Sequence, residues 1–153
     1  MLFVASHFSL ITGVGSGATS LNAFDNSLQT AGVGNYNLLR VSSILPPYCT
    51  RSLSVNIPFG SLLPIAYSSL CSDEKGREIT AAIGVGVPTD SSSVGVIMEF
   101  SDFTPGLQAE KQVEQMVKDA MTQRKIAIKE IICRSCSTIV DSYNCVFAAI
   151  ALW

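Results

Sequence analysis

The 153-residue chain carries little charge, because Asp, Glu, Lys and Arg together make up 14% of it. An average soluble domain has roughly 25%. So few charged side chains do not cover the whole outside, which predicts that part of the surface lies in contacts between copies of the chain. The formal net charge of −2 argues against nucleic acid or an anionic membrane surface as a partner.

Histidine is almost absent, since His7 is the only one. A single histidine counts against Ser-His-Asp and Cys-His catalytic arrangements. Cys133 and Cys136 have the spacing of half a zinc site, but no second pair follows them. In a strand the two thiols would also point to opposite faces. We therefore expect no metal site.

Long apolar runs are missing as well, because none reaches the roughly 18 residues that a membrane-spanning helix needs. The apolar start, Met1–Ile11, has no basic leader and is interrupted by polar residues, so we expect a strand there rather than a signal peptide. The five cysteines are odd in number and irregularly spaced. This pattern predicts free thiols in a reducing cytoplasm.

Hydrophobic periodicity gives the order of elements in the first third of the chain. A strand near Leu2–Thr12 is expected to end in a glycine turn at Gly13–Gly17. A helix should follow, with Thr19 or Ser20 as its N-cap and Gly32 as its C-cap. Its predicted apolar face consists of Leu21, Phe24, Leu28 and Ala31. A second strand is predicted over Tyr36–Ser43, and Leu53–Pro64 should be irregular or an edge.

The rest of the chain is predicted to form one long helix and four strands. The helix begins after Thr104-Pro105, and its apolar stripe is Ala109, Val113, Met116, Val117 and Ala120. The strands are expected at Glu78–Val87, Ser93–Phe100, Ile126–Cys133 and Cys145–Trp153. With no repeat and no linker, residues 1–153 are predicted to be a single α+β domain. Its form is an α/β sandwich of mostly antiparallel sheets flanked by helices.

The serine pair Ser42-Ser43 ends an apolar, strand-like stretch, and Pro46-Pro47 then prevents regular structure from continuing. Ser43 Oγ in such a constrained position can attack the carbonyl carbon of Ser42 and convert the peptide bond into an ester. Elimination and hydrolysis would then leave a pyruvoyl group at the start of a new chain. Taken alone, a serine pair is more simply a solvated loop.

Three polar residues could serve chemistry near this pair, and each has a simpler interpretation. Glu99 follows an apolar strand, where it either reaches water or lies in an apolar pocket and delivers a proton. Asp25 on the first helix is either a solvated residue or the anion near a cationic ligand. Asn37 is either an ordinary strand residue or a hydrogen-bond partner for an oxygen at the cleavage site.

Together these residues stand in sequence blocks that resemble the pyruvoyl-dependent arginine decarboxylase family. The most specific block is Val41–Pro47, which reads Val-Ser-Ser-Ile-Leu-Pro-Pro. The resemblance extends over nearly the whole chain and includes Leu21–Asp25, Ala31–Leu38, Leu63–Tyr67, Ile79–Ile83, Ile97–Glu99 and Phe147–Trp153.

The resemblance implies cleavage between Ser42 and Ser43, which gives a β chain of residues 1–42 and an α chain of residues 43–153. Ser43 would become the pyruvoyl cofactor. A homotrimer of αβ units with active sites between neighbouring protomers is also implied.

By position, Glu99 would be the proton donor, and Asn37 would assist processing or orient the pyruvoyl group. Asp25 would pair with the substrate guanidinium, and Leu21 would line its pocket.

The implied reaction is decarboxylation of L-arginine to agmatine and carbon dioxide, a step toward polyamines, in the cytoplasm. The guanidinium is a permanent cation that makes forked contacts with a carboxylate, which agrees with a role for Asp25. Two alternatives stay open. One is the same chemistry on another amino acid, and the other is an unprocessed, non-catalytic trimeric binding protein.

Overall fold

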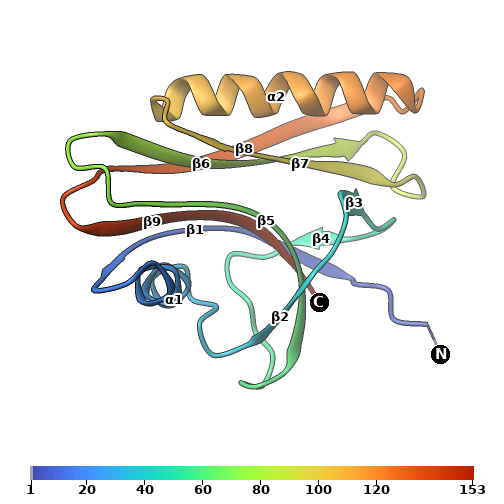
Figure 1. Ribbon diagram of the computed structural model, residues 1–153. Helices are drawn as coiled ribbons and strands as arrows, with labels where there is room; N and C mark the ends of the chain where they lie inside the picture. Colours follow the sequence, from blue (N-terminus) through green and yellow to red (C-terminus); the bar gives the residue numbers. More distant parts are fainter. Residues whose placement is uncertain (1) are drawn as a thin grey trace.

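The computed structural model describes residues 2–153, and within them two helices and nine strands form four layers (Figure 1). The elements are β1 (His7–Gly17), α1 (Ser20–Thr30), β2 (Asn37–Arg40), β3 (Ile44–Leu45), β4 (Thr50–Arg51), β5 (Leu62–Ser72), β6 (Glu78–Pro88), β7 (Gly95–Asp102), α2 (Gly106–Gln123), β8 (Ile128–Ile139) and β9 (Tyr143–Leu152). The predicted α+β sandwich is confirmed.

Two sheets stack face to face, and each carries one helix on its outer side (Figure 1). The first sheet has the strand order β2-β5-β9-β1-β4 and is covered by α1. The second has the order β3-β7-β6-β8 and is covered by α2. Most neighbouring strands are antiparallel, but β2 pairs with β5 and β4 pairs with β1 in parallel.

The hydrophobic core is divided among the three interfaces between these layers. Side chains such as Ile83, Val146 and Ile150 fill the space between the sheets. Phe147 and Ile65 pack under α1, whereas the apolar stripe of α2 packs on the second sheet. Since β9 contributes to two of the three, its nearly continuous apolar sequence follows from burial on both faces.

The glycines at 13, 15 and 17 lie inside β1, so the predicted turn at Gly13–Gly17 is wrong. Their function is to let α1 lie directly on the strand. A Cβ atom at Gly13 would lie 2.1 Å from the backbone oxygen of Ser27, and one at Gly15 would lie 2.2 Å from its backbone nitrogen. Any side chain at these positions would therefore push the helix off the sheet.

The first helix begins as predicted, with the Thr19 hydroxyl accepting a hydrogen bond from the backbone N–H of Asn22. Its buried residues are Ala23 and Ser27, which face the glycines of β1. Leu21, predicted on the apolar face, is instead 76% exposed. The close approach to β1 selects small residues for the contact and turns Leu21 outward.

The predicted apolar stripe of the second helix is confirmed at Ala109, Val113 and Val117, which are fully buried on the face of α2 that meets the sheet. Met116 and Ala120 are only half-buried, and Met121, which the predicted stripe did not include, is fully buried.

Strand β8 runs beyond the predicted end at Cys133 and contains both Cys133 and Cys136. The two thiols point to opposite faces, as expected, since Cys133 packs beneath α2 and Cys136 packs between the sheets. Burial raises the pKa of Cys133 to about 11.

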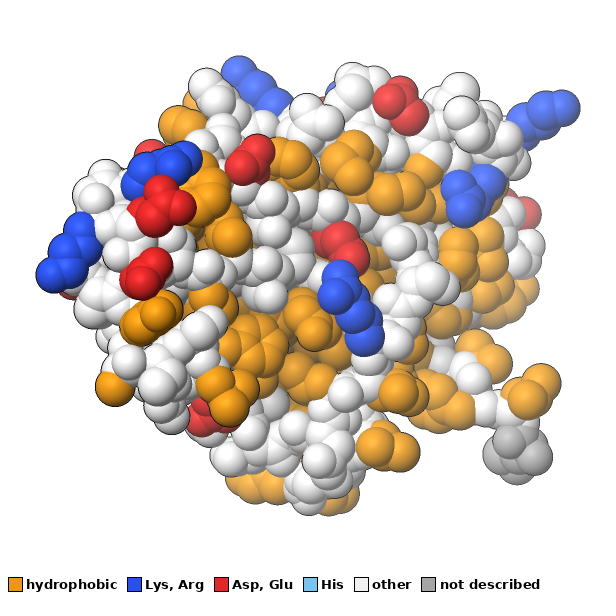
Figure 2. Space-filling view, viewed as in Figure 1, with side chains coloured by type: hydrophobic (Ala, Val, Ile, Leu, Met, Phe, Trp, Pro, Cys, Tyr) orange, Lys and Arg blue, Asp and Glu red, His pale blue; other side chains and the backbone are white. Residues whose placement is uncertain are grey.

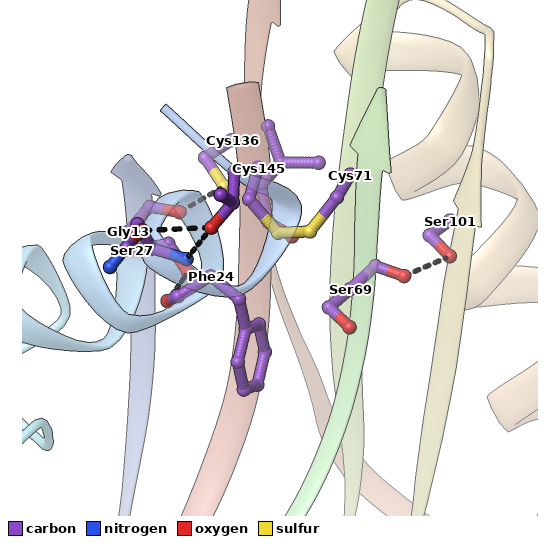
Figure 3. The surroundings of a disulfide bond; sticks show 11 residues. Gly13, Phe24, Ser27, Ser69, Cys71, Ser101, Cys136 and Cys145 are labelled. Carbon is purple, nitrogen blue, oxygen red and sulfur yellow. Dashed lines mark hydrogen bonds between the residues drawn. A yellow bond between two sulfur atoms is a disulfide. The ribbon is translucent and has the colours of Figure 1, made fainter. Parts of the chain in front are cut away.

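Cys71 and Cys145 form a disulfide, which corrects the prediction that all five cysteines are free thiols (Figure 3). The two residues are direct partners on the antiparallel strands β5 and β9, with their Cα atoms 4.0 Å apart. Linear spacing could not reveal this pair, because β5 itself was not predicted as a strand. Cys49, Cys133 and Cys136 are free thiols.

The predicted strand Tyr36–Ser43 is shorter in the structure and divided between the two sheets. It forms β2 only as far as Arg40, and after a short connection the chain joins the second sheet as β3. The serine pair therefore lies where the chain crosses from one sheet to the other. In residues 2–153, neither helix is long and apolar enough to cross a membrane.

Candidate active site

Ser42 and Ser43 are held between the sheets by hydrogen bonds on both sides of the pair. On the first sheet, the N–H of Val41 donates to the carbonyl oxygen of Ile65 at 3.0 Å. On the second, the N–H of Ile97 donates to the carbonyl oxygen of Ser43 at 2.9 Å. The peptide bond between the two serines is thus fixed at both ends while it belongs to neither sheet.

The carbonyl group of Ser42 has a hydrogen-bond donor already in place. The backbone N–H of Ile44 donates to the Ser42 oxygen at 2.9 Å, which closes a three-residue turn around Ser43. Attack on the Ser42 carbonyl carbon would put negative charge on that oxygen. A preformed N–H donor is the feature that stabilises such an oxyanion.

The nitrogen on the other side of this peptide bond is unengaged. Within the described part of the chain, the N–H of Ser43 donates no hydrogen bond. The Ser42 side chain is exposed and that of Ser43 is half-buried. The bond therefore combines a polarised carbonyl with a nitrogen that is not tied into a strand.

An open apolar cavity of about 480 Å³ adjoins the serine pair. Ser42 contributes to its wall together with Leu39, Val41 and Ile44. The remaining lining residues are also apolar and come from the N-terminal segment, the prolines that follow β3, and the single residues Pro64, Val94 and Leu152. A reactive carbonyl formed here would lie beside a weakly hydrated surface.

Glu99 lies on β7, two residues after the Ile97 that holds Ser43. Its side chain is 28% exposed, and its Oε1 accepts a hydrogen bond from Arg40 Nη2 at 2.9 Å. Arg40 is the last residue of β2, two positions before Ser42. The fold thus brings Glu99 and the serine pair to the same crossing point, although 56 positions separate them in sequence.

Arg40 was not among the residues selected from the sequence. Its guanidinium carbon lies 4.5 Å from the centre of the Tyr67 ring, and its Nη2 also donates to the Tyr67 carbonyl oxygen at 3.0 Å. The hydrogen bond to Glu99 raises the pKa of Arg40 above its ordinary value. A basic residue at the end of a strand gives no sequence signal of such contacts, because each partner comes from another element.

Asn37 lies at the opposite end of β2 from the serines. Its side-chain amide donates to the carbonyl oxygen of Gly60 at 2.7 Å. Because β2 ends at Arg40, the regular alternation of a strand does not relate Asn37 to Ser43. In this chain the amide orders the loop before β5, and its role in processing stays a prediction.

Leu21 and Asp25 project from α1 into solvent, and in residues 2–153 Asp25 takes part in no ion pair. Between them, Phe24 packs its ring 6.3 Å from that of Tyr67, the residue that Arg40 covers. Figure 2 shows hydrophobic side chains gathered on this side of the molecule, with an acidic and a basic group in contact among uncharged atoms. In a single chain, Leu21 and Asp25 are therefore accessible to a second copy of the chain.

Comparisons with known proteins agree with one another. Residues 7–153 match the family model described as pyruvoyl-dependent arginine decarboxylase. A protein of that name from Methanocaldococcus jannaschii is 41% identical over 145 residues, which cover 95% of this chain and 88% of the relative. One from Pyrococcus furiosus is 36% identical over 147 residues, covering 94% and 92%. One from Thermococcus sibiricus is 42% identical over 123 residues, covering 79% and 77%.

Proposed function

The chain belongs to the pyruvoyl-dependent arginine decarboxylase family, and we propose that it converts L-arginine to agmatine and carbon dioxide after cutting itself between Ser42 and Ser43. The observation that carries this proposal is the geometry of that peptide bond. Its carbonyl oxygen faces the N–H of Ile44, and its nitrogen is not held by a strand. We propose that residues 1–42 and 43–153 are the two products.

Self-cleavage uses atoms of the chain and one water molecule. Ser43 Oγ bonds to the carbonyl carbon of Ser42, the carbon–nitrogen bond breaks, and the hydroxyl proton passes to the released nitrogen. Loss of the Ser43 α-proton then expels the Ser42 carboxylate. Water then hydrolyses the carbon–nitrogen bond of residue 43. The nitrogen leaves as ammonia, and residue 43 becomes a pyruvoyl group. The Ile44 N–H stabilises the first step, because the Ser42 oxygen carries negative charge there.

The surroundings of Ser43 fit this cofactor. Ser43 is half-buried, and the apolar cavity reaches its neighbour Ser42. When formed, the pyruvoyl group supplies a carbonyl that takes up the electron pair released with carbon dioxide. We assign to Glu99 the proton that Cα of the substrate requires, because Glu99 lies on the strand whose Ile97 N–H is bonded to Ser43.

We propose that the substrate pocket is completed by a second copy of the chain in a homotrimer of αβ units. In this arrangement Asp25 binds the guanidinium of arginine and Leu21 lines the pocket. The support is that α1 presents both side chains to solvent, and that further large apolar groups are exposed at Leu39 (51%) and Leu62 (70%). Asn37 assists processing in the same proposal.

Combining two impaired variants tests this shared site. Asp25→Asn and Glu99→Gln chains, produced together in one cell so that whole chains assemble before they cut, should release more carbon dioxide at low arginine concentration than the two variants produced separately. Mixed trimers would contain some sites with both native residues. A mixture no more active than its components, at a trimeric mass, would place both residues in one protomer and contradict the shared site.

The role in polyamine formation and the cytoplasmic location belong to the same proposal. Agmatine is a polyamine precursor, and the three free thiols suit a reducing compartment. In the Cys71–Cys145 disulfide, Cys145 is fully buried and Cys71 is half-buried, so one of the two sulfur atoms is protected from a reductant.

Release of labelled carbon dioxide from a panel of amino acids tests the activity. We expect the wild-type protein to act on L-arginine and the Ser43→Ala protein to act on none, because that variant lacks the attacking hydroxyl. If carbon dioxide were released only from another amino acid, the protein would still be a decarboxylase, but arginine would not be its substrate. A folded trimeric wild-type protein that releases nothing would favour a binding function.

A further inference from the structure

The hydrogen bonds between β2 and β5 form a regular series that stops just before the cleavage site. The N–H of Asn37 donates to the carbonyl oxygen of Ser61 at 2.9 Å, and the N–H of Val41 donates to that of Ile65 at 3.0 Å. Donors and acceptors both advance by two residues at each step of a parallel ladder. The next step would join the N–H of Ser43 to the carbonyl oxygen of Tyr67.

That bond is absent from the described residues, and Arg40 donates to the same acceptor instead. Arg40 Nη2 donates to the Tyr67 oxygen at 3.0 Å, whereas the Ser43 N–H donates to nothing. The side chain of the last residue of β2 thus donates where the backbone group that extends the strand would have donated. Tyr67 remains satisfied, and Ser43 stays out of the sheet.

Three contacts hold the guanidinium in this position. The same Nη2 donates to Glu99 Oε1 at 2.9 Å, and the guanidinium lies over the Tyr67 ring. The side chain is 58% exposed, so its location is set by these contacts rather than by burial. A planar guanidinium suits such a position, because it donates in its plane while its face rests on an aromatic ring.

We propose that Arg40 is a positioning residue for self-cleavage, which keeps the amide of Ser43 free by occupying the acceptor that would draw it into the first sheet. This inference rests on the proposed cleavage between Ser42 and Ser43. The Ser43 nitrogen must leave the Ser42 carbonyl and accept a proton. A backbone N–H that is hydrogen-bonded to a strand keeps its peptide group planar and fixed. This opposes both the departure of the nitrogen and its protonation.

The rate of self-cleavage in Arg40 variants gives the first test. Arg40→Met keeps most of the side-chain volume but has no donor, and Arg40→Lys keeps the charge without the planar group. We expect Arg40→Met to cut about tenfold more slowly than wild type or worse, with Arg40→Lys between them. Newly synthesised protein is sampled over time, and the uncut fraction is read from its intact mass.

Arg77→Met is the matched control. Arg77 also pairs with a carboxylate, that of Glu74 at 2.8 Å, and its guanidinium carbon lies 4.0 Å from the centre of the Phe103 ring. Its side chain is similarly exposed, at 50%. It contacts neither serine nor Tyr67, so the Arg77→Met chain should cut at the wild-type rate.

Hydrogen exchange at position 43 gives a test that does not depend on cutting. In a Ser43→Ala background the chain cannot form the ester, so the amide at position 43 can be followed by NMR. We expect this amide to exchange at least about tenfold more slowly once Arg40→Met is added, because it can then pair with Tyr67. Arg77→Met in the same background should leave its exchange unchanged.

The outcomes separate this inference from the proposed function. Arg40→Met cutting as fast as Arg77→Met would overturn the inference, and so would slower cutting without added protection at position 43. A wild-type protein that never cuts would remove the proposed function. The exchange comparison would then still decide whether Arg40 keeps position 43 out of the sheet.

Discussion

Among single residues, Glu99 is a carboxyl group that the fold carries to the serine pair. It is mostly shielded, and its strand holds Ser43. Position alone supports its assignment as the proton donor, since the sequence places Glu99 at the end of an apolar strand and the fold brings that strand to the serines. In this assignment Glu99 acts in the decarboxylation of arginine and has no role in self-cleavage.

Substitution of Glu99 should therefore impair turnover and spare cutting. For Glu99→Gln we expect complete cleavage into two chains but a fall of roughly a hundredfold or more in kcat for arginine, the usual loss when a general acid is removed. Glu74→Gln removes another carboxylate that pairs with an arginine, far from the site, and is the control. A Glu99→Gln enzyme with wild-type kcat would remove Glu99 from the mechanism.

Asp25 has a different expected role, because it is exposed and has no ion-pair partner in the described residues. Asp25→Asn should raise KM for arginine roughly ten- to a hundredfold and leave cutting unchanged, because it removes one charge-assisted contact with the guanidinium. Steady-state kinetics beside Asp73→Asn, another exposed carboxylate, measures this. An unchanged KM would show that the guanidinium binds elsewhere.

At the scale of elements, the contact between α1 and β1 depends on glycine. Gly15→Ala should lower the free energy of unfolding by about 1–3 kcal/mol or more, because the new methyl group would meet backbone atoms of α1 that have no room to move. Urea unfolding measures the change.

Gly106→Ala is the control for this substitution. A Cβ there would lie 3.3 Å from the Ser135 side-chain oxygen, which can move aside. Equal stability of the two variants would contradict the close contact between helix and strand.

The same contact shows what sequence reasoning could predict about the elements. The long helix was predictable because its apolar residues repeat with the helical period and pack on one sheet. The glycines of β1 predict a turn, because a sequence does not show that a helix will pack against them. Strand β5 was missed, since it starts amid prolines and mixes serines with apolar residues.

The candidate site was predictable only in part, for a similar reason. Ser42, Ser43 and Glu99 stand in specific sequence blocks, and the fold brings them to one place. Arg40 contacts Tyr67 on β5 and Glu99 on β7, and no local sequence pattern predicts contacts between residues of different strands.

For the whole molecule, the disulfide between β5 and β9 should contribute to stability. It links residues 74 positions apart, and both lie in the segment 43–153. Constraining the unfolded chain over such a loop is worth up to about 4 kcal/mol. We therefore expect Cys71→Ala combined with Cys145→Ala to unfold at lower urea concentration than wild type without reductant.

Reductant completes this comparison. Treatment with reductant under unfolding conditions should lower the urea concentration at which the wild type unfolds toward that of the double variant. It should leave the unfolding of the double variant unchanged. The Cys49→Ala chain keeps the disulfide and serves as control. Wild type and double variant with equal free energies of unfolding would contradict a stabilising disulfide.

The intact mass of purified, assembled protein tests the central claim most directly. Self-cleavage with cofactor formation predicts two chains, residues 1–42 and residues 43–153, with the larger lighter by one ammonia than simple hydrolysis would leave it and blocked at its first residue. A single mass for the continuous 153-residue chain, in material that is correctly folded and assembled, would contradict the account.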